Sequence, residues 1–201
     1  MESGAQNSLG PMSAGQPTFD FVTKTVGCTT GDKLACLRKV PYAALTNAIA
    51  LTPGLFAYQS LNLAWLPRVD GDFFEENPQV LVQKGKYSKI PIINGNCDDE
   101  GTFFSLVQSN ITTDAQAVEY FNKNYYPKAT PAEIAQIAQL YPSTPSAGSP
   151  YDTGDRNTLT PQFKRIASFS GDLVFQAARR RFMSVASATQ NSWSYSESHF
   201  L

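Results

Sequence analysis

The sequence predicts an α/β layered fold with a mainly parallel sheet. Residues Ile90–Gly95 form a continuous apolar, β-branched run that ends in Asn-Gly, which is typical of a buried strand in such a sheet. A second, weakly alternating segment, Trp193–Ser196, predicts a final strand. Helical patterns fill much of the chain between these segments, and strands separated by helices indicate an α/β architecture. Two strands are too few for a self-sufficient doubly wound sheet.

The amino-terminal part of the chain predicts a loop followed by short helices. Residues 8–18 are rich in Gly, Pro, Ser and Gln and lack apolar periodicity, so we expect an exposed loop there. Asp32 precedes an apolar run and can cap a helix, and Pro41 suits a first helical turn. The helices expected in this part cover residues 19–25, 33–38 and 41–50.

Turn and cap signals alternate with apolar runs in the rest of the chain. The Asp70–Gly71 pair lies between short apolar runs and predicts a turn between two brief extended segments over residues 66–74. Residues 142–157 are rich in Pro, Ser and Gly and predict a loop. Thr and Pro at favourable starting positions predict four further helices, over residues 78–84, 115–124, 130–140 and 160–186.

Composition places the chain among ordinary globular proteins. It has 201 residues, 42% of them hydrophobic and 16% charged, with a formal net charge of -1. Because the charge is balanced, no basic field is available for a nucleic acid, and we expect none to bind. The apolar runs are far shorter than the roughly 18 to 20 residues that cross a bilayer, so no membrane span is expected.

Cysteine spacing and a sequon favour an extracellular protein. Cys28 and Cys36 flank a short loop containing Gly31, and either a local disulfide or two buried free thiols fits this spacing. The spacing matches no metal-ligand pattern. Asn110 begins an Asn-Ile-Thr sequon and is a candidate glycosylation site. Residues 1–6 have neither a basic nor an apolar region typical of a signal peptide.

The densest polar cluster follows the predicted strand directly, in residues 94–104. Functional groups of open α/β sheets gather at the carboxyl ends of strands, and a carboxylate there can accept a hydrogen bond from a histidine and hold its tautomer. The alternative is a solvated acidic loop in which Asp98 or Asp99 caps the next helix. Three carboxylates beside Cys97 should raise the pKa of its thiol, so we expect a structural role for it and not a nucleophile.

Most of a hydrolytic or cofactor-binding apparatus is missing from the sequence. The single histidine, His199, follows Glu100 in an order compatible with a serine-hydrolase triad, but it lies at the end of the chain, where an ordinary exposed histidine is the alternative. The Gly-x-Ser-x-Gly nucleophile elbow and a glycine-rich oxyanion loop are absent. No phosphate-binding loop or dinucleotide fingerprint is present, so no cofactor or metal is expected.

Six passages in a consistent order carry a family resemblance. They are Met1–Ala5, Cys28–Leu37, Leu66–Gly71, Asp99–Phe104, Ser149–Gly154 and Leu159–Ile166. Together they resemble the type-B carboxylesterase/lipase family, and in particular its fungal lipases of the Candida rugosa and Geotrichum kind. The passage around Glu100 looks like the signature at the family's triad acid, and the passage from Cys28 looks like its small disulfide loop.

The resemblance implies a partial α/β-hydrolase fold, namely the C-terminal part of the central sheet with its flanking helices, in one partial domain over residues 1–201. It implies that Glu100 is the triad acid, that Cys28 pairs with Cys36, and that the protein is secreted by a signal peptide upstream of this chain. The implied substrate is an acyl ester or lipid acted on by the full-length protein. The surroundings of His199 do not match those of the family's histidine, so only Glu100 is carried over.

Two other interpretations remain open from the sequence. The fold also supports proteins without a working triad, in which case this chain would belong to a cholinesterase-like binding or adhesion module. A product that functions alone is a further possibility. Its strand at Ile90–Ile93 would lack neighbours, and an apolar sheet face would stay uncovered as a surface prone to aggregation.

Overall fold

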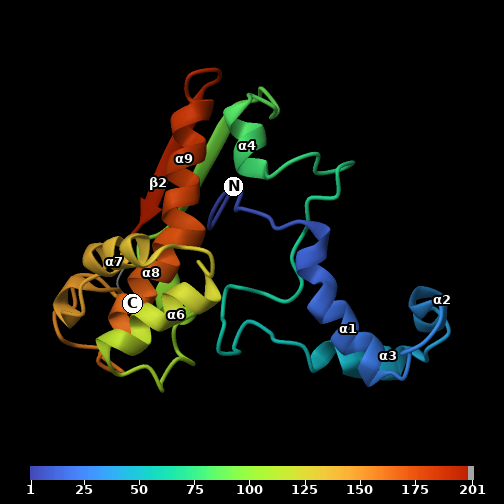
Figure 1. Ribbon diagram of the computed structural model, residues 1–201. Helices are drawn as coiled ribbons and strands as arrows, with labels where there is room; N and C mark the ends of the chain where they lie inside the picture. The colour runs from blue at the N-terminus through green and yellow to red at the C-terminus, as the bar shows by residue number, and fades with distance from the viewer. Residues whose placement is uncertain (199–201) are drawn as a thin grey trace.

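The structure is a computed structural model that describes residues 1–198, and it consists of a body and an arm (Figure 1). His199, considered above as a catalytic base, lies outside the described residues. The elements of the body are α4 (Pro78–Gln83), β1 (Ile92–Cys97), α5 (Glu100–Phe103), α6 (Asp114–Asn124), α7 (Pro131–Leu140), η2 (Pro145–Ala147), α8 (Phe163–Gly171), η3 (Asp172–Gln176), α9 (Ala177–Ala186) and β2 (Ser192–Glu197). None of the helices within residues 1–198 is both long and apolar enough to span a membrane.

Two parallel strands form the sheet, as the sequence predicts. Strand β1 pairs with β2 in a register that sets Ile93 opposite Trp193 and Gly95 opposite Tyr195. On the other edge of β1, Glu2 forms an isolated parallel bridge to Gly95. The amino terminus therefore pairs with β1 on the edge opposite β2.

The predicted boundaries of the first strand are wrong by two residues at each end. The strand begins at Ile92 and continues through Asn94 and Gly95 to Cys97, so the Asn-Gly pair does not end it. The reason is packing across the sheet, because a Cβ atom on Gly95 would lie 2.3 Å from the ring of Tyr195. The glycine makes room for an aromatic side chain on the neighbouring strand and does not form a turn.

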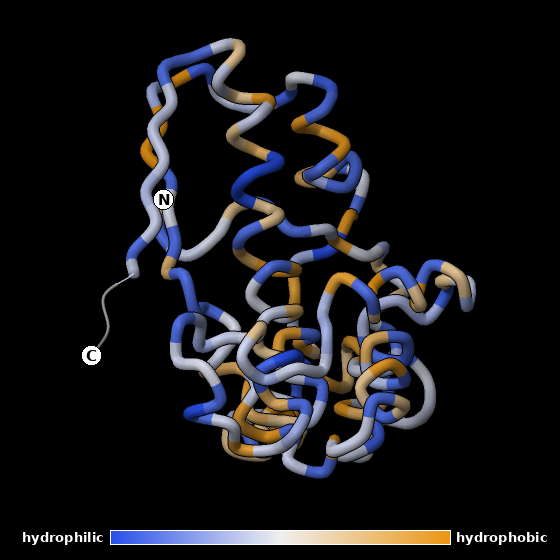
Figure 2. Tube along the Cα trace, turned by 90° about the vertical axis from the view of Figure 1, so that its left-hand side faces the viewer, coloured by the Kyte–Doolittle hydropathy of each residue, from blue (hydrophilic) through white to orange (hydrophobic). Residues whose placement is uncertain are grey.

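Helices cover only one face of the sheet. A buried apolar cluster joins α4, β1 and α9 through Val82, Ile92, Phe182 and Ala186. On the opposite face, Ile93 is 61% exposed and Trp193 is 55% exposed. Figure 2 shows the strand pair at one side of the molecule with helices on its inner side only. The uncovered apolar face expected from the sequence is present.

A second apolar core lies between α6 and α8. The buried side chains of this cluster come from α6, α8 and the loop before α6, and they include Tyr120, Phe121, Ile166 and Phe169. Helices α6 and α7 each start with a complete capping box, so both predicted helix starts are confirmed. Buried Arg165 donates hydrogen bonds to the Ala138 carbonyl and to the Asp114 carboxylate, which ties both helices to α8.

The predicted long helix is continuous but not uniform. It starts at Phe163 instead of Thr160, because the Phe163 N–H closes a turn onto the Thr160 carbonyl 3.1 Å away. Helices α8 and α9 are joined by η3, a π-helical segment that no sequence signal predicts. The helix ends at Ala186, as expected.

The arm consists of residues 11–69, which leave the body and return to it, so that the two ends of the segment lie side by side. Pro11 and Val69 form an isolated parallel bridge. Between them lie η1 (Met12–Gly15), α1 (Gln16–Thr25), α2 (Lys33–Leu37) and α3 (Tyr42–Ala50). Asp32 caps α2 by accepting a hydrogen bond from the Ala35 N–H at 3.0 Å, as predicted. The Cys28–Cys36 disulfide expected from the family resemblance is present.

Three expectations for this part of the chain need correction. The loop predicted over residues 8–18 ends early, because Pro17 lies in the first turn of α1. Pro41 is the N-cap residue of α3 and does not lie in its first turn. The two extended segments around Asp70 are absent apart from the bridge at Val69, since the Asp70 carboxylate accepts hydrogen bonds from the N–H groups of Asp72 and Phe74 and holds a turn.

Candidate active site

The acidic segment lies at the carboxyl ends of the two parallel strands. Strand β1 ends at Cys97, and Asp98 and Asp99 lead directly into α5, whose first residue is Glu100. Strand β2 ends beside them at Glu197, and its carbonyl accepts a hydrogen bond from the Asp98 N–H at 2.8 Å. This is the edge where open α/β sheets carry functional groups, as the sequence predicts.

Glu100 is half-buried and is held against the end of its own strand. Its Oε1 atom accepts a hydrogen bond from the Cys97 N–H at 2.9 Å. A backbone N–H that binds a carboxylate oxygen fixes the direction of the group. A carboxylate oriented in this way can accept a hydrogen bond from an imidazole N–H, which is the chemistry expected of a triad acid.

Asp99 occupies the N-cap position of α5 but makes no capping hydrogen bond. Its Oδ1 atom accepts two hydrogen bonds from a segment some fifty residues away, from the Ser149 hydroxyl and the Tyr151 N–H, both at 2.8 Å. The capping role considered from the sequence is therefore wrong for Asp99. The carboxylate joins α5 to the loop that precedes α8.

Gly101 lets α5 approach the backbone of α8 at very short range. A Cβ atom at Gly101 would lie 1.8 Å from the Ala167 carbonyl oxygen and 2.5 Å from the Gly171 nitrogen. No side chain larger than hydrogen fits between the two helices. The turn that carries Glu100 is thus anchored on both sides of the glutamate, at Asp99 by hydrogen bonds and at Gly101 by backbone packing.

The electrostatic environment argues against a nucleophilic cysteine. Burial raises the pKa of the Cys97 thiol, and the charges of Glu100, Glu197 and Asp99 raise it further. The thiol stays protonated at neutral pH and is a poor nucleophile. Burial also raises the pKa of the Asp98 carboxyl, with smaller contributions from Asp99 and Asp152. The structural role expected for Cys97 fits this environment.

Sequence reasoning missed two residues that shape this edge. Arg179 on α9 donates hydrogen bonds to Asn96 of β1 and to Ser194 of β2, so one buried guanidinium joins both strands. Ser149 is 1% exposed and binds Asp99. No local pattern marks either contact, because each joins residues far apart in the chain.

The other predicted sites lie away from this edge. The Cys28–Cys36 disulfide lies in the arm, at the start of α2. Asn110 is exposed in the loop before α6, so its side chain is accessible, and its glycosylation stays a prediction.

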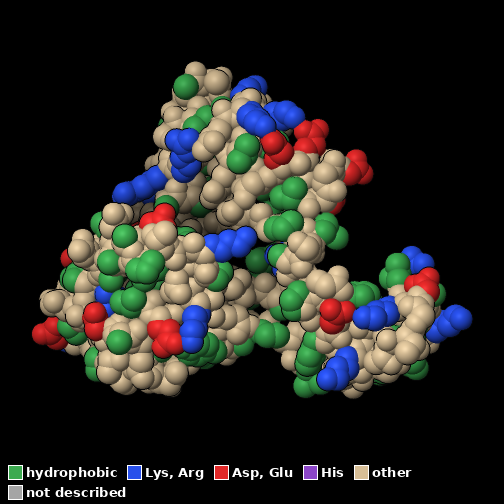
Figure 3. All heavy atoms as spheres, viewed as in Figure 1, with side chains coloured by type: hydrophobic (Ala, Val, Ile, Leu, Met, Phe, Trp, Pro, Cys, Tyr) green, Lys and Arg blue, Asp and Glu red, His purple; other side chains and the backbone are tan. Residues whose placement is uncertain are grey.

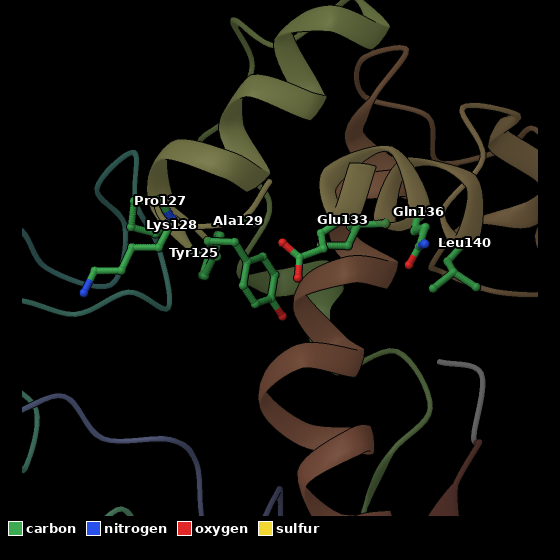
Figure 4. Close-up of a pocket in the computed structure, with 9 residues that line it drawn as sticks. Tyr125, Pro127, Lys128, Ala129, Glu133, Gln136 and Leu140 are labelled. Carbon is green, nitrogen blue, oxygen red and sulfur yellow. The ribbon is translucent and has the colours of Figure 1, made fainter. Parts of the chain in front are cut away.

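An open groove lies between the end of α6 and α7 (Figure 4). It has a volume of about 640 Å³ and is lined mainly by apolar and aromatic side chains, including Tyr125, Ile137 and Leu140. Its acid, Glu133, is engaged in the capping box of α7 through the Thr130 N–H and hydroxyl. None of the acids after β1 lines this groove.

Comparison with known proteins places this geometry in a family. The profile of the Carboxylesterase family matches residues 1–200. The chain is 45% identical over 186 residues to Lipase 4 of Diutina rugosa and 43% identical over 188 residues to Secreted triacylglycerol lipase LIP1 of Gibberella zeae. These matches cover 91% and 92% of this chain, but 34% and 32% of the relatives, so the chain spans about a third of their length.

Solved structures show the same fold. Aspergillus niger EstA superposes with a TM-score of 0.76 at 22% identity, over 97% of this chain and 36% of that protein. A PNB esterase superposes with a TM-score of 0.69 at 20% identity, over 98% of this chain and 37% of that protein. The two parallel strands and their helices are therefore part of an α/β-hydrolase fold.

Proposed function

Because this chain belongs to the carboxylesterase family, we propose that it is the part of a serine ester hydrolase that supplies the acid of the catalytic triad, Glu100. The observation that carries the proposal is the position of Glu100. It is the first helical residue after β1, at the carboxyl edge of a parallel sheet, with its carboxylate oriented by the Cys97 N–H. Residues 1–201 would then be one part of a single hydrolase domain.

In this role the Glu100 carboxylate accepts a hydrogen bond from the Nδ1–H of a histidine and fixes the tautomer of the ring. The histidine takes the proton of a serine hydroxyl as that oxygen attacks the ester carbonyl, and the carboxylate stabilises the imidazolium that forms. The alcohol leaves with that proton, and water then releases the acid from the acyl-enzyme. In this proposal the serine and the histidine belong to parts of the protein outside residues 1–201.

The substrate class and location follow from the relatives as part of the same proposal. Relatives named as lipases, one of them a triacylglycerol lipase, support acyl esters, including triacylglycerols, as substrates. Several relatives are named as secreted lipases. The disulfide and the exposed sequon at Asn110 also suit a secreted glycoprotein.

The 201-residue chain should be inactive alone, because a carboxylate without the serine and histidine provides no route to an acyl-enzyme. The test is hydrolysis of p-nitrophenyl butyrate by the purified chain, with Glu100→Gln as the matched control. We expect the same background rate from both. Hydrolysis by the parent chain that is lost in Glu100→Gln would overturn the proposed division of the triad.

The coding sequence around this segment separates the enzyme from the binding module. A Gly-x-Ser-x-Gly elbow encoded upstream and a histidine encoded downstream support the hydrolase. An elbow whose serine is replaced supports a non-catalytic binding or adhesion module instead, with Glu100 as a relic.

A further inference from the structure

We propose that Asp99 is a positioning residue for Glu100, and that it acts by binding the Ser149–Tyr151 segment and thereby fixing the first turn of α5. The inference rests on the proposed function of Glu100 and deepens it. It assigns a role to a loop that no motif connects with the acid cluster.

The first argument is the use of the Asp99 carboxylate. An acidic residue at an N-cap ordinarily accepts a hydrogen bond from an N–H of the first helical turn. Asp99 makes no such bond, and its Oδ1 atom instead accepts the Ser149 hydroxyl and the Tyr151 N–H at 2.8 Å each. The side chain therefore serves the contact with a distant loop and does not stabilise its own helix.

The second argument is that the Ser149 hydroxyl forms hydrogen bonds with two residues of this turn, Asp99 before Glu100 and Thr102 after it. The Ser149 and Thr102 hydroxyl oxygens are 2.7 Å apart. Because Ser149 gives its single hydroxyl proton to Asp99, the Thr102 hydroxyl donates in the second bond. A single serine that is 1% exposed thus connects the residue before Glu100 to the residue two positions after it.

The third argument is that the loop holding Asp99 is itself fixed to α8. The Ser149 N–H donates to the Ser168 hydroxyl at 2.9 Å. Buried Lys164 donates from its Nζ to the Thr153 hydroxyl at 2.6 Å, and that hydroxyl donates to the Pro150 carbonyl at 2.7 Å. The loop that binds Asp99 is therefore itself hydrogen-bonded to α8. Because α8 holds this loop in place, the loop can constrain the first turn of α5.

The Cys97 amide is a direct reporter of the Glu100 carboxylate, because the two form a hydrogen bond of 2.9 Å. The chain has three cysteines, so selective ¹⁵N-cysteine labelling gives three backbone amide signals, and Cys97→Ser identifies that of Cys97 by its loss. As Glu100 is protonated, the hydrogen bond weakens and the Cys97 signal shifts.

Other titrating groups near this amide must be separated from Glu100. They are Asp98, Asp99, Glu197, the Cys97 thiol and Tyr195, whose surroundings also include Glu2. Burial and the acidic neighbours raise the pKa of the Cys97 thiol, so it does not titrate at acidic pH. Glu100→Gln identifies the component of the titration that belongs to Glu100, since only that component vanishes.

The experiment is a titration of the Cys97 amide from acidic to neutral pH in the 201-residue chain. Asp99→Ala removes both hydrogen bonds and should reduce the Glu100 component to less than half of its amplitude. Asp99→Asn keeps an acceptor oxygen and should restore most of it. Asp155→Ala, which removes an exposed carboxylate from the same loop region, should leave it unchanged.

Ser149→Ala keeps the Asp99 charge and removes only the bridging hydroxyl, so it tests the proposal if Asp99→Ala does not fold. We expect a reduced amplitude here too. An undiminished Glu100 component in Ser149→Ala, or in a folded Asp99→Ala, would overturn the positioning role. Neither result depends on ester hydrolysis, so the positioning role and the catalytic role of Glu100 can fail separately.

Discussion

The body and the arm use their apolar side chains in opposite ways. In the body, Tyr120, Phe121, Ile166 and Phe169 are at most 2% exposed. In the arm, Tyr42 is 84% exposed and Leu51 is 66% exposed, and only Val22, Cys28 and Ala48 are buried among its apolar residues. Figures 1 and 3 show α1, α2 and α3 standing apart from α6, α7 and α8. The body buries its own core, whereas the arm displays surface suited to contact with other protein.

Helix capping also differs between the two parts, though less sharply. In the body, α6 and α7 have capping boxes and α8 has no side-chain cap, whereas in the arm Asp32 caps α2 and neither α1 nor α3 has a side-chain cap. The arm relies on a disulfide and on contacts with the body made by residues 51–69, which follow α3. One of these contacts is the edge-to-face pair of Tyr58 with Tyr120, whose ring centroids are 5.2 Å apart. The candidate site lies in the body, but the arm reaches the end of α5. The buried Ser60 hydroxyl donates to the Phe104 carbonyl at 2.5 Å, and Phe56 packs edge-to-face on Phe103 with ring centroids 5.3 Å apart.

The largest effect is expected where two helices of the body touch through backbone atoms. Gly101→Ala places a Cβ atom 1.8 Å from the Ala167 carbonyl oxygen, and a backbone oxygen cannot turn aside. We expect a loss of about 3 kcal/mol or more in the free energy of unfolding, measured by urea denaturation.

The matched control is Gly54→Ala in the arm, where no atom lies within 4 Å of the added Cβ. Its change should stay within about 0.5 kcal/mol. If Gly101→Ala and Gly54→Ala lowered the free energy of unfolding equally, the backbone contact at Gly101 would not be tighter than the surroundings of Gly54.

Reduction of the Cys28–Cys36 disulfide should weaken the arm alone. A closed loop of this size stabilises by about 2.5 kcal/mol in the chain-entropy account. We expect faster amide hydrogen exchange in α1 and α2 and unchanged exchange around Phe121 and Phe169, in a Cys97→Ser background that excludes thiol exchange with the third cysteine. Faster exchange throughout the body would show that the two parts unfold together.

Loss of a helix cap should have a moderate effect confined to the body. Thr130 accepts the Glu133 N–H in the capping box of α7, so Thr130→Ala should cost about 1 kcal/mol, measured by thermal unfolding. Thr25→Ala is the control, since this hydroxyl bonds only to a carbonyl at the exposed end of α1. If Thr25→Ala were the more damaging change, the arm would be better stabilised than its exposure indicates.

The smallest effect on stability is expected on the uncovered sheet face. Ile93→Thr replaces a side chain that is 61% exposed and should change stability by no more than about 0.5 kcal/mol while reducing self-association in light scattering. The neighbouring residue Ile92 points to the covered face and is 8% exposed, so Ile92→Thr should cost about 2 kcal/mol. Similar costs at both positions would mean that the outer face is packed in solution.

Local sequence signals predicted the elements of this chain well. Capping and proline signals placed α2, α6 and α7, and a β-branched run placed β1, because these features depend on neighbours within a few residues. The end of β1 was wrong because the role of Gly95 depends on Tyr195, a residue of another strand. The π-helical segment η3 was missed because no local pattern encodes it.

The candidate site was predictable only in part. The acid cluster was predicted because functional groups of open α/β sheets lie at the carboxyl ends of strands. The family resemblance then identified Glu100 among its carboxylates. The Asp99 contacts with Ser149 and Tyr151, and the bridging of both strands by Arg179, arise from tertiary packing. Spacing along the chain holds no information about contacts of this kind.

The measurement that tests the central claim most directly is the hydrolysis of p-nitrophenyl butyrate by the complete product of the gene that encodes this chain, compared with its Glu100→Gln variant. If Glu100 is the triad acid, kcat should fall by about 10⁴-fold with little change in KM, while Asp98→Asn keeps most of the activity. Activity of Glu100→Gln within about tenfold of the parent enzyme would contradict the assignment, because a neutral amide cannot stabilise the imidazolium.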